Sequence, residues 1–160
     1  MSDGWLHVLT LVSALGCGLM AGFFFAFSVS VMKALGGLPP AQGIAAMQSI
    51  NVVVINPVFM IAFFGTAVAC VAVAISALRS WDGAGAAYLL AGGLLYLAGS
   101  FLVTIVFNVP RNDALAAVNP ASETGAALWA SYLTAWTAWN HVRTAAALAA
   151  AAALSIALRH

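Results

Sequence analysis

The segment WTAWNHVRTAAALAAAAALSIAL, residues 136–158, joins two kinds of sequence that seldom occur together. Its second part is almost entirely alanine and leucine, and the whole segment has the length of about 20 residues that a helix needs to cross a bilayer. Its first part carries Asn140, His141 and Arg143. An ionisable side chain inside a spanning helix costs about 3 kcal/mol on insertion scales and usually marks a functional site. We therefore expect a membrane helix with a polar site near its start.

The composition of the whole chain places it in a membrane rather than in water. Hydrophobic residues make up 64% of the 160 positions, and charged residues make up 6%. Soluble domains carry roughly a quarter charged residues, so this chain lacks the charged surface that water requires. The formal net charge of +1 gives no reason to expect nucleic acid as a partner. The expected partner is the lipid bilayer.

Long apolar runs separated by polar breaks predict four spanning helices. They are expected at about residues 5–32, 52–78, 84–107 and 136–158. Pro110 is expected to stop the third helix, and Ser122 is expected to cap an unbroken last helix over about residues 123–158. Glycines and prolines interrupt the chain at 36–40, and a short helix that we expect to lie on the membrane surface follows at 41–50. The predicted fold is therefore all-α: an integral membrane four-helix bundle, forming one domain over residues 1–160, with a short interfacial helix between the first two spans.

Two further patterns concern orientation and assembly. Arg79 and Arg159 lie close to the ends of spans, which favours cytoplasmic termini in a bacterial plasma membrane. Small residues recur at every fourth position of the first span, at Ala14, Gly18, Gly22 and Ala26. This spacing lets another helix approach closely, so small-residue faces are the expected route to an oligomer.

Four alternating spans bring polar residues to one end of the bundle. The first span ends, the second begins, the third ends and the fourth begins on the same side. The polar residues expected there are Asn51, Asn56, Asn108, Asn112, Asn140, His141 and Arg143. Such convergence at one end is typical of a ligand pocket between helices. The alternative is that the asparagines only hydrogen-bond across the bundle, for about 1 kcal/mol each.

Aromatic residues share one helical face with Arg143. The residues spaced three or four apart are Trp129, Tyr132, Trp136, Asn140 and Arg143. An interfacial aromatic belt is the usual role of tryptophan at this depth, but a belt would ring the helix. The one-sided spacing favours the lining of a pocket. We expect the Arg143 guanidinium to lie within reach of Asn51, Asn108 or Asn112 and to face a cavity lined by Trp136 and Trp139. His141 lies about 200° from Arg143 around the helix, so a histidine bonded to its neighbours is the alternative to a catalytic one.

Two motifs resemble a known family. Asn108-Val109-Pro110 followed by Asn112, and Trp136-x-x-Trp139-Asn140-x-x-Arg143 before an alanine-rich helix, are similar to the anthrone oxygenase-like membrane proteins. Much of that family is labelled only as a domain of unknown function. The resemblance covers the whole chain. Characterised relatives oxidise an anthrone to an anthraquinone with O₂ and without a metal or flavin. The resemblance implies that Asn108, Asn112, Trp139, Asn140 and Arg143 are the shared polar positions.

That chemistry is compatible with the candidate residues. An anthrone has an acidic methylene, and its enolate can give an electron to O₂ directly. The aromatic residues would bind the flat rings, Arg143 would stabilise the anion, and the asparagines would orient phenol and carbonyl groups. Three scattered histidines without clustered carboxylates predict no metal site. No glycine-rich nucleotide motif is present, so no cofactor is expected.

Three hypotheses remain open at this point. The first is a membrane oxygenase of anthrone-like or quinone-like aromatic substrates, with a lipophilic aromatic molecule and O₂ as its small-molecule partners. The second is a non-catalytic binder or carrier of a lipophilic molecule, which would use the same pocket. The third is a structural membrane protein in which Arg143 only bonds across the bundle.

Overall fold

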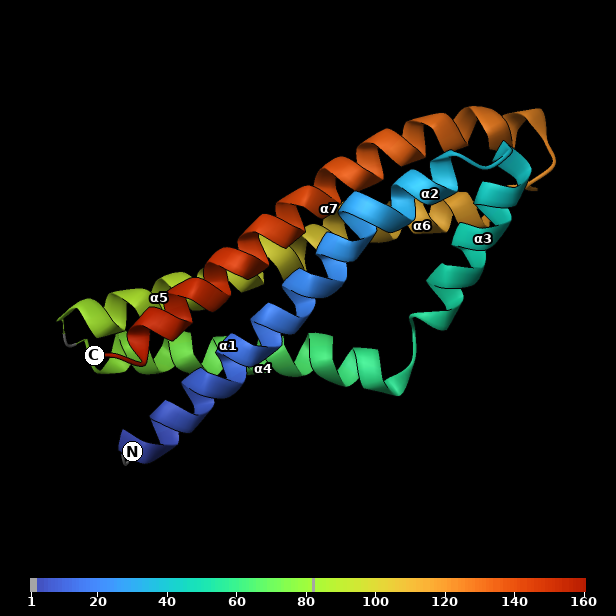
Figure 1. Ribbon diagram of the computed structural model, residues 1–160. Coiled ribbons are helices and arrows are strands. Elements are labelled where there is room, and N and C mark those ends of the chain that lie inside the picture. The colour runs from blue at the N-terminus through green and yellow to red at the C-terminus, as the bar shows by residue number, and fades with distance from the viewer. Residues whose placement is uncertain (1–2, 82) are drawn as a thin grey trace.

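The computed structural model describes residues 3–81 and 83–160, and these are helical almost throughout (Figure 1). In chain order the elements are α1 (Asp3–Ala26), η1 (Phe27–Val31), α2 (Met32–Gly36), α3 (Pro40–Val53), α4 (Pro57–Arg79), α5 (Gly83–Tyr96), η2 (Leu97–Leu102), η3 (Thr104–Asn108), α6 (Val109–Ala116) and α7 (Glu123–Ala157). The elements η1, η2 and η3 are π-helical turns. Because these turns continue their neighbouring helices, the described residues form four long rods and the shorter helix α3.

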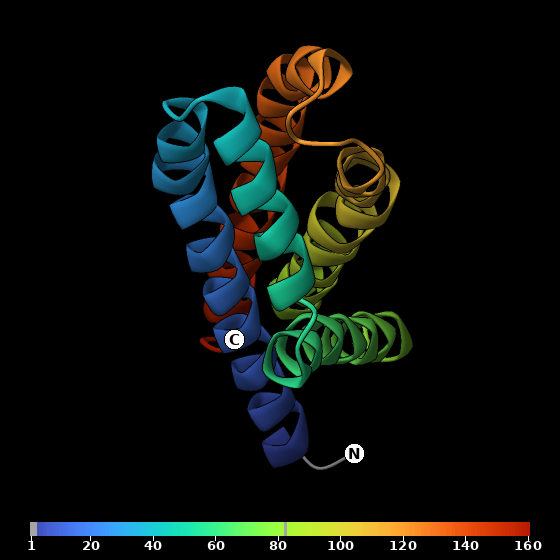
Figure 2. The ribbon, with the colours of Figure 1, turned by 90° about the vertical axis from the view of Figure 1, so that its right-hand side faces the viewer.

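The rods alternate in direction, as predicted. In Figure 1 the rod α1–η1–α2 leads away from the N-terminus, α4 returns, the rod α5–α6 leads away again, and α7 returns to the C-terminus. Both ends of the chain therefore lie at one end of the molecule. Helix α3 lies at the other end, where it packs against α2, α6 and α7 (Figure 2).

Three rods are long and apolar enough to cross a membrane. Among the described residues these are Gly4–Gly36, Pro57–Arg79 and Gly83–Ala116. The all-α bundle is thus of membrane type. Helix α7 has 35 residues and a length of about 52 Å, well beyond the roughly 30 Å of a hydrocarbon core. Its alanine-rich sequence is less apolar than the other three, and its role as a fourth span remains a prediction.

Helix α4 begins later than the predicted start at residue 52. Asn56 caps it, because its Oδ1 accepts a hydrogen bond from the Phe59 N–H at 3.1 Å, and Pro57 follows at the first turn. The chain up to Val53 belongs instead to α3, which extends the predicted short helix at both ends. Asn51 therefore lies on α3 and does not open the second span.

The third rod continues past the predicted stop at Pro110, which was wrong. Pro110 is the second residue of α6. The residue before it, Val109, follows η3 directly, and its N–H bonds to the Thr104 carbonyl, five residues back, before the α-helical pattern resumes. A missing N–H is tolerated at such a change of register, so the helix runs on to Ala116.

The last helix forms as predicted and is unbroken. Ser122 caps α7 by accepting a hydrogen bond from the Gly125 N–H at 3.0 Å. The helix packs most extensively against α1 and α5, so it is the central element of the bundle.

Two clusters of buried apolar side chains fill the bundle. One includes Cys17, Cys70 and Tyr96 and lies where α1, α4, α5 and the second half of α7 meet. The other includes Ile44 and Leu115 and lies where α2, α3, α6 and the first half of α7 meet. The polar residues of α7 lie between these two clusters.

The small residues of α1 divide between the inside and the outside of the bundle. Ala14 is buried, whereas Gly18, Gly22 and Ala26 are exposed. A Cβ atom added at Gly18 or Gly22 would meet nothing within 4 Å. Self-association through this face remains a prediction.

Candidate functional site

The residues of the aromatic and polar stripe point into the bundle. Their exposed fractions are 3% for Trp129, 3% for Tyr132, 5% for Trp136, 0% for Asn140 and 4% for Arg143. An interfacial belt would leave such side chains at the surface. The face that these residues share is therefore the buried face of α7.

Arg143 is a buried cation held by neutral groups. Its Nη1 donates to Thr104 Oγ1 at 3.1 Å, and its Nη2 donates to Asn140 Oδ1 at 2.6 Å. Its Cζ lies 4.3 Å from the centre of the Phe24 ring and 5.1 Å from that of the Trp136 ring. Within the described chain, its Nε has no hydrogen-bond partner. Amide oxygens and ring faces offset only part of the cost of burying a charge, so this environment favours an anionic ligand.

Asn140 connects Arg143 to the first rod. Its Nδ2 donates to the Phe24 carbonyl at 2.7 Å and to Ser28 Oγ at 2.6 Å, while its Oδ1 accepts from Arg143. The amide thus uses both its donor and its acceptor sides at zero exposure. Asn140 therefore fixes the position of the guanidinium.

The other asparagines do not surround Arg143, contrary to our expectation. Asn112 Oδ1 accepts from the Tyr132 hydroxyl and from Trp136 Nε1, both at 2.8 Å. Asn108 Nδ2 donates to the Trp136 carbonyl at 3.2 Å. Burial raises the pKa of the Tyr132 phenol above its usual range, so the phenol remains a donor. Asn112 therefore orients the two aromatic side chains that come about two and three turns before Arg143 on α7, whereas Asn108 contacts the backbone of Trp136.

Some buried polar atoms near the Arg143 network have no hydrogen-bond partner among residues 3–81 and 83–160. In the described part of the chain, Asn51 Nδ2 and Asn108 Oδ1 are buried and have no hydrogen-bond partner, as is true of Arg143 Nε. Buried donors and acceptors are nearly always satisfied in proteins, by water or by a ligand where no side chain serves. Two of these atoms belong to Asn108 and Arg143, which contact Trp136, so they add hydrogen-bonding capacity around that ring.

Three predicted site residues lie apart from this network. His141 is exposed and lines a cavity of about 410 Å³ that also includes Lys33. Trp139 is half-buried and stacks on Phe107 at a ring separation of 3.6 Å. Asn56 is exposed and serves as the cap of α4. Roles of His141, Trp139 and Asn56 in catalysis or substrate binding therefore remain predictions.

Three residues of the network were not predicted: Phe24, Ser28 and Thr104. Thr104, Asn108 and Asn112 follow one another at intervals of four, which was a visible signal. In a regular α-helix each such step turns by about 400°, so the row drifts around the helix. The wider π turn of η3 turns less per residue and keeps the row facing α7. Phe24 and Ser28 carried no comparable signal within their apolar run.

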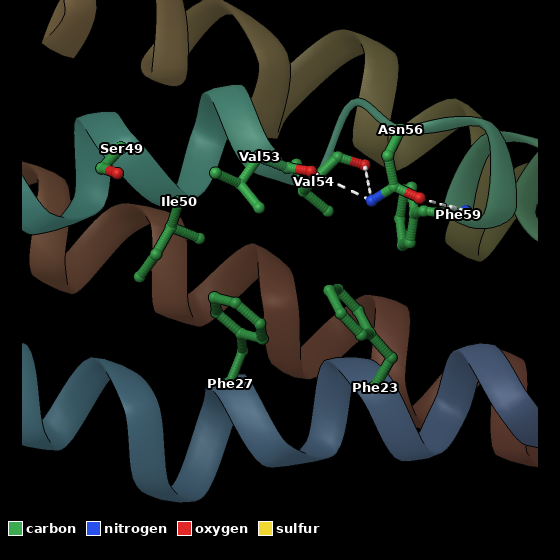
Figure 3. Close-up of a pocket in the computed structure, with 8 residues that line it drawn as sticks. All are labelled: Phe23, Phe27, Ser49, Ile50, Val53, Val54, Asn56 and Phe59. Atoms are coloured by element: carbon green, nitrogen blue, oxygen red, sulfur yellow. Dashed lines mark hydrogen bonds between the residues drawn. The ribbon is translucent and has the colours of Figure 1, made fainter.

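A groove opens beside the network, between α1–η1, α3 and the start of α4 (Figure 3). Its volume is about 350 Å³, and it is lined by Phe23, Phe27, Ser49, Ile50, Val53, Val54, Asn56 and Phe59. The Phe27 ring lies 5.9 Å from the Trp136 ring. We expected a cavity lined by Trp136 and Trp139, but neither lines this groove, because Trp136 is packed within the bundle and Trp139 stacks on Phe107.

Metal ligands do not gather at this site. Over residues 3–81 and 83–160, no group of three or more His, Cys, Asp or Glu side chains is arranged to hold a metal ion. The functional groups that the site offers are a guanidinium, amides, hydroxyls and aromatic rings.

The fold and the site together define a helical bundle of membrane type, with a buried arginine held between aromatic rings on its central helix. The family model described as anthrone oxygenase matches residues 59–153, more than half of the chain. The chain therefore belongs to the anthrone oxygenase family, as its motifs indicated.

The match has informative limits. It includes Asn108, Asn112 and the stripe from Trp129 to Arg143 but begins only after α1, η1 and α3. The residues that complete the network from the first rod, Phe24 and Ser28, thus lie outside the matched region. No curated protein and no solved structure matches the chain.

Proposed function

We propose that the protein oxidises an anthrone-type aromatic molecule with O₂ and without a cofactor. The observation that carries this proposal is the buried Arg143, which is surrounded by neutral groups and ring faces in a member of the anthrone oxygenase family. A fixed cation in a water-poor site stabilises negative charge that develops during a reaction. An anthrone acquires such a charge when its methylene ionises.

The overall reaction converts the ring CH₂ and one O₂ into a ring C=O and one H₂O. Loss of one methylene proton gives an enolate, which transfers an electron to O₂. The resulting radical and superoxide combine into a C–O bond and, on taking up a proton, give a hydroperoxide. Elimination then breaks the O–O bond and the second C–H bond and leaves the quinone carbonyl. Both methylene protons end in the water, and the carbon loses the four electrons that O₂ gains.

The residues have distinct roles in this proposal. Arg143 stabilises the enolate and the bound superoxide. Phe24 and Trp136 confine the reacting ring and keep water away from the charge. Asn140 positions Arg143, and Asn112 positions Trp136. Catalytic contact by Asn108, and any role of His141 or Trp139, remain predictions.

The test measures O₂ uptake and quinone absorbance with purified protein in nanodiscs and anthrone as substrate. We expect turnover above the rate in empty nanodiscs. Arg143→Lys keeps the charge but loses the planar fork that reaches both Thr104 and Asn140, so turnover should fall at least tenfold. A wild-type rate equal to that of empty nanodiscs contradicts the proposal.

One observation favours a non-catalytic binder as the second candidate. Among the described residues, Arg143 is hydrogen-bonded only to Thr104 and Asn140, and neither is a base that could take a methylene proton. A protein that binds a lipophilic anion without turnover would need the same cation and rings. Mass spectrometry of small molecules that copurify with inactive protein would identify such a ligand.

The proposed location is a bacterial plasma membrane, with α7 as the fourth span and both termini in the cytoplasm. The placement of both ends of the chain at the same end of the bundle supports a shared side for the termini (Figure 1), and Arg79 and Arg159 at that end favour the cytoplasm. A reporter that works only in the cytoplasm should be active when it is fused to the C-terminus. Activity of a reporter that works only outside the membrane contradicts this orientation.

A further inference from the structure

The groove between α1–η1, α3 and α4 is mainly aromatic and aliphatic. Phe23, Phe27 and Phe59 form one continuous wall, with ring separations of 5.0 Å between Phe23 and Phe27 and 5.0 Å between Phe23 and Phe59. Figure 3 shows Phe23 and Phe27 pointing from the first rod toward α3, with Ile50 and Val53 opposite. A volume of about 350 Å³ is within the range of small-molecule sites.

The groove adjoins the rings that hold Arg143. Phe27 lies 5.9 Å from Trp136, and Phe23 lies 5.9 Å from Phe24. Trp136 and Phe24 are the two rings that the Arg143 guanidinium covers. Two successive pairs of rings therefore connect the groove to the buried cation: Phe23 and Phe27 line the groove, and Phe24 and Trp136 contact Arg143.

The mouth of the groove is apolar. Val53, which lines it, is 68% exposed, and its neighbours Ile55 and Val58 are 68% and 80% exposed. Such a surface favours contact with acyl chains over contact with water. A ligand that enters here must first dissolve in the bilayer, which selects neutral lipophilic molecules.

The groove offers little polar recognition. Asn56 uses its amide in the turn, since Nδ2 donates to the Val53 carbonyl at 3.0 Å and Oδ1 accepts from the Phe59 N–H. The exposed hydroxyl of Ser49 is the other polar side chain along the lining. Ring contacts are therefore the main interaction available, and aromatic ligands make better use of them than acyl chains do.

We infer that this groove binds the ring system of a neutral, flat, fused-ring aromatic molecule that enters from the bilayer, next to the site where Arg143 stabilises its anion. The substrate class in this inference rests on the proposed oxygenase function. The groove holds the apolar body of the molecule, whereas Arg143 acts on the charge that forms when the molecule ionises.

The test measures binding rather than turnover, with radiolabelled anthraquinone as a neutral tricyclic probe and protein in nanodiscs. Val53→Trp fills the groove from its rim and should raise the Kd for anthraquinone at least tenfold. Val52→Trp is the matched control, because Val52 is adjacent and 73% exposed but does not line the groove. Its Kd should stay within twofold of the wild-type value.

A second measurement does not depend on a bulky substitution. Cys17 and Cys70 are fully buried, so a bimane label on Val53→Cys or Val52→Cys reacts with the new thiol selectively. Bound anthraquinone should quench the label at position 53 and leave the label at position 52 largely unquenched. Equal quenching at the two positions, or an unchanged Kd in Val53→Trp, overturns the inference.

The two proposals can fail separately. Suppose that wild-type protein binds anthraquinone, that Val53→Trp but not Val52→Trp raises the Kd, and that anthrone is not oxidised. The groove assignment then stands and the oxygenase function fails. If anthrone is oxidised while Val53→Trp changes neither the Kd for anthraquinone nor the KM for anthrone, the function stands and the groove assignment fails.

Discussion

From Trp129 to Arg143 the buried face of α7 carries rings, an amide and a guanidinium, whereas from Ala147 to Leu154 it carries only alanine and leucine. In this second half of α7, the rod formed by α5 and η2 packs very close to the helix. A Cβ atom added at Gly92 would lie 2.6 Å from Leu154 Cγ, and one added at Gly99 would lie 2.5 Å from Ala146 Cβ. In the first half, side-chain hydrogen bonds and ring contacts connect α7 to its neighbours instead.

The two halves of α7 therefore contribute different properties: the alanine- and leucine-rich half contributes close packing, and the polar half contributes charged and hydrogen-bonding groups. Close packing of small residues brings many atoms into contact and leaves no room for a ligand. The polar half carries a cation whose hydrogen-bond partners among the described residues are neutral, and it retains unpaired buried atoms. Changes in the two halves should therefore affect different measurements.

Arg143→Gln should have the largest effect on activity. Loss of the cation should lower turnover of anthrone about 100-fold, comparable to the loss of one oxyanion donor. The melting temperature should not fall, because the change removes a buried charge whose hydrogen-bond partners among the described residues are neutral. Arg159→Gln, at an exposed position, is the control and should change neither quantity. A large drop in melting temperature with unchanged turnover would favour a purely structural arginine.

Gly92→Leu should have the largest effect on stability. The new side chain would overlap Leu154 and the Ala150 carbonyl, so the free energy of unfolding in detergent should fall by about 3 kcal/mol. Gly18→Leu is the matched control, because its Cβ meets no atom within 4 Å, and unfolding should change little. Equal effects at the two glycines would show that α5 and α7 do not pack this closely.

Thr104→Asp should change stability and activity in opposite directions. A carboxylate in place of the hydroxyl that contacts Arg143 would supply the missing counter-charge. The melting temperature should rise relative to Thr104→Asn, while turnover should fall about tenfold because the field of the cation is neutralised. Identical melting curves for the two variants would mean that Arg143 already has a compensating partner.

Tyr132→Phe should have the smallest effect. It removes one of the two donors to Asn112 Oδ1, and the bond from Trp136 Nε1 remains, so unfolding should become easier by about 1 kcal/mol. Tyr88→Phe, at a side chain that is 37% exposed, is the control. A loss of turnover much larger than the loss of stability would assign the Tyr132 hydroxyl a direct role in the reaction.

Much of this architecture follows from local sequence patterns. The apolar runs, the cap at Ser122 and the three-and-four spacing from Trp129 to Arg143 depend on residues close together in the chain. Helical periodicity alone places Asn140 and Arg143 on the same face as Trp136. The family motifs likewise lie within short segments of the matched region.

The π turns had no recognisable signal, because a change of hydrogen-bond register depends on how neighbouring helices pack. One consequence was the continuation of the third rod through Pro110. Another was the alignment of Thr104 with Asn108 on the face toward α7. No signal in the sequence indicated that α3 continues to Val53, and because it does, Asn51 lies on α3 and not on the second span.

The sequence by itself determined that this is a helical membrane-type chain and which face of α7 is buried, since both depend on composition and on a period of 3.6 residues. Only the tertiary structure decided that Arg143 is held by Thr104, Asn140 and Phe24 rather than by the other asparagines. The physical reason is that a side-chain contact depends on the relative rotation and height of two helices. A shift of one turn moves a side chain about 5.4 Å along the axis, which is enough to exchange one partner for another.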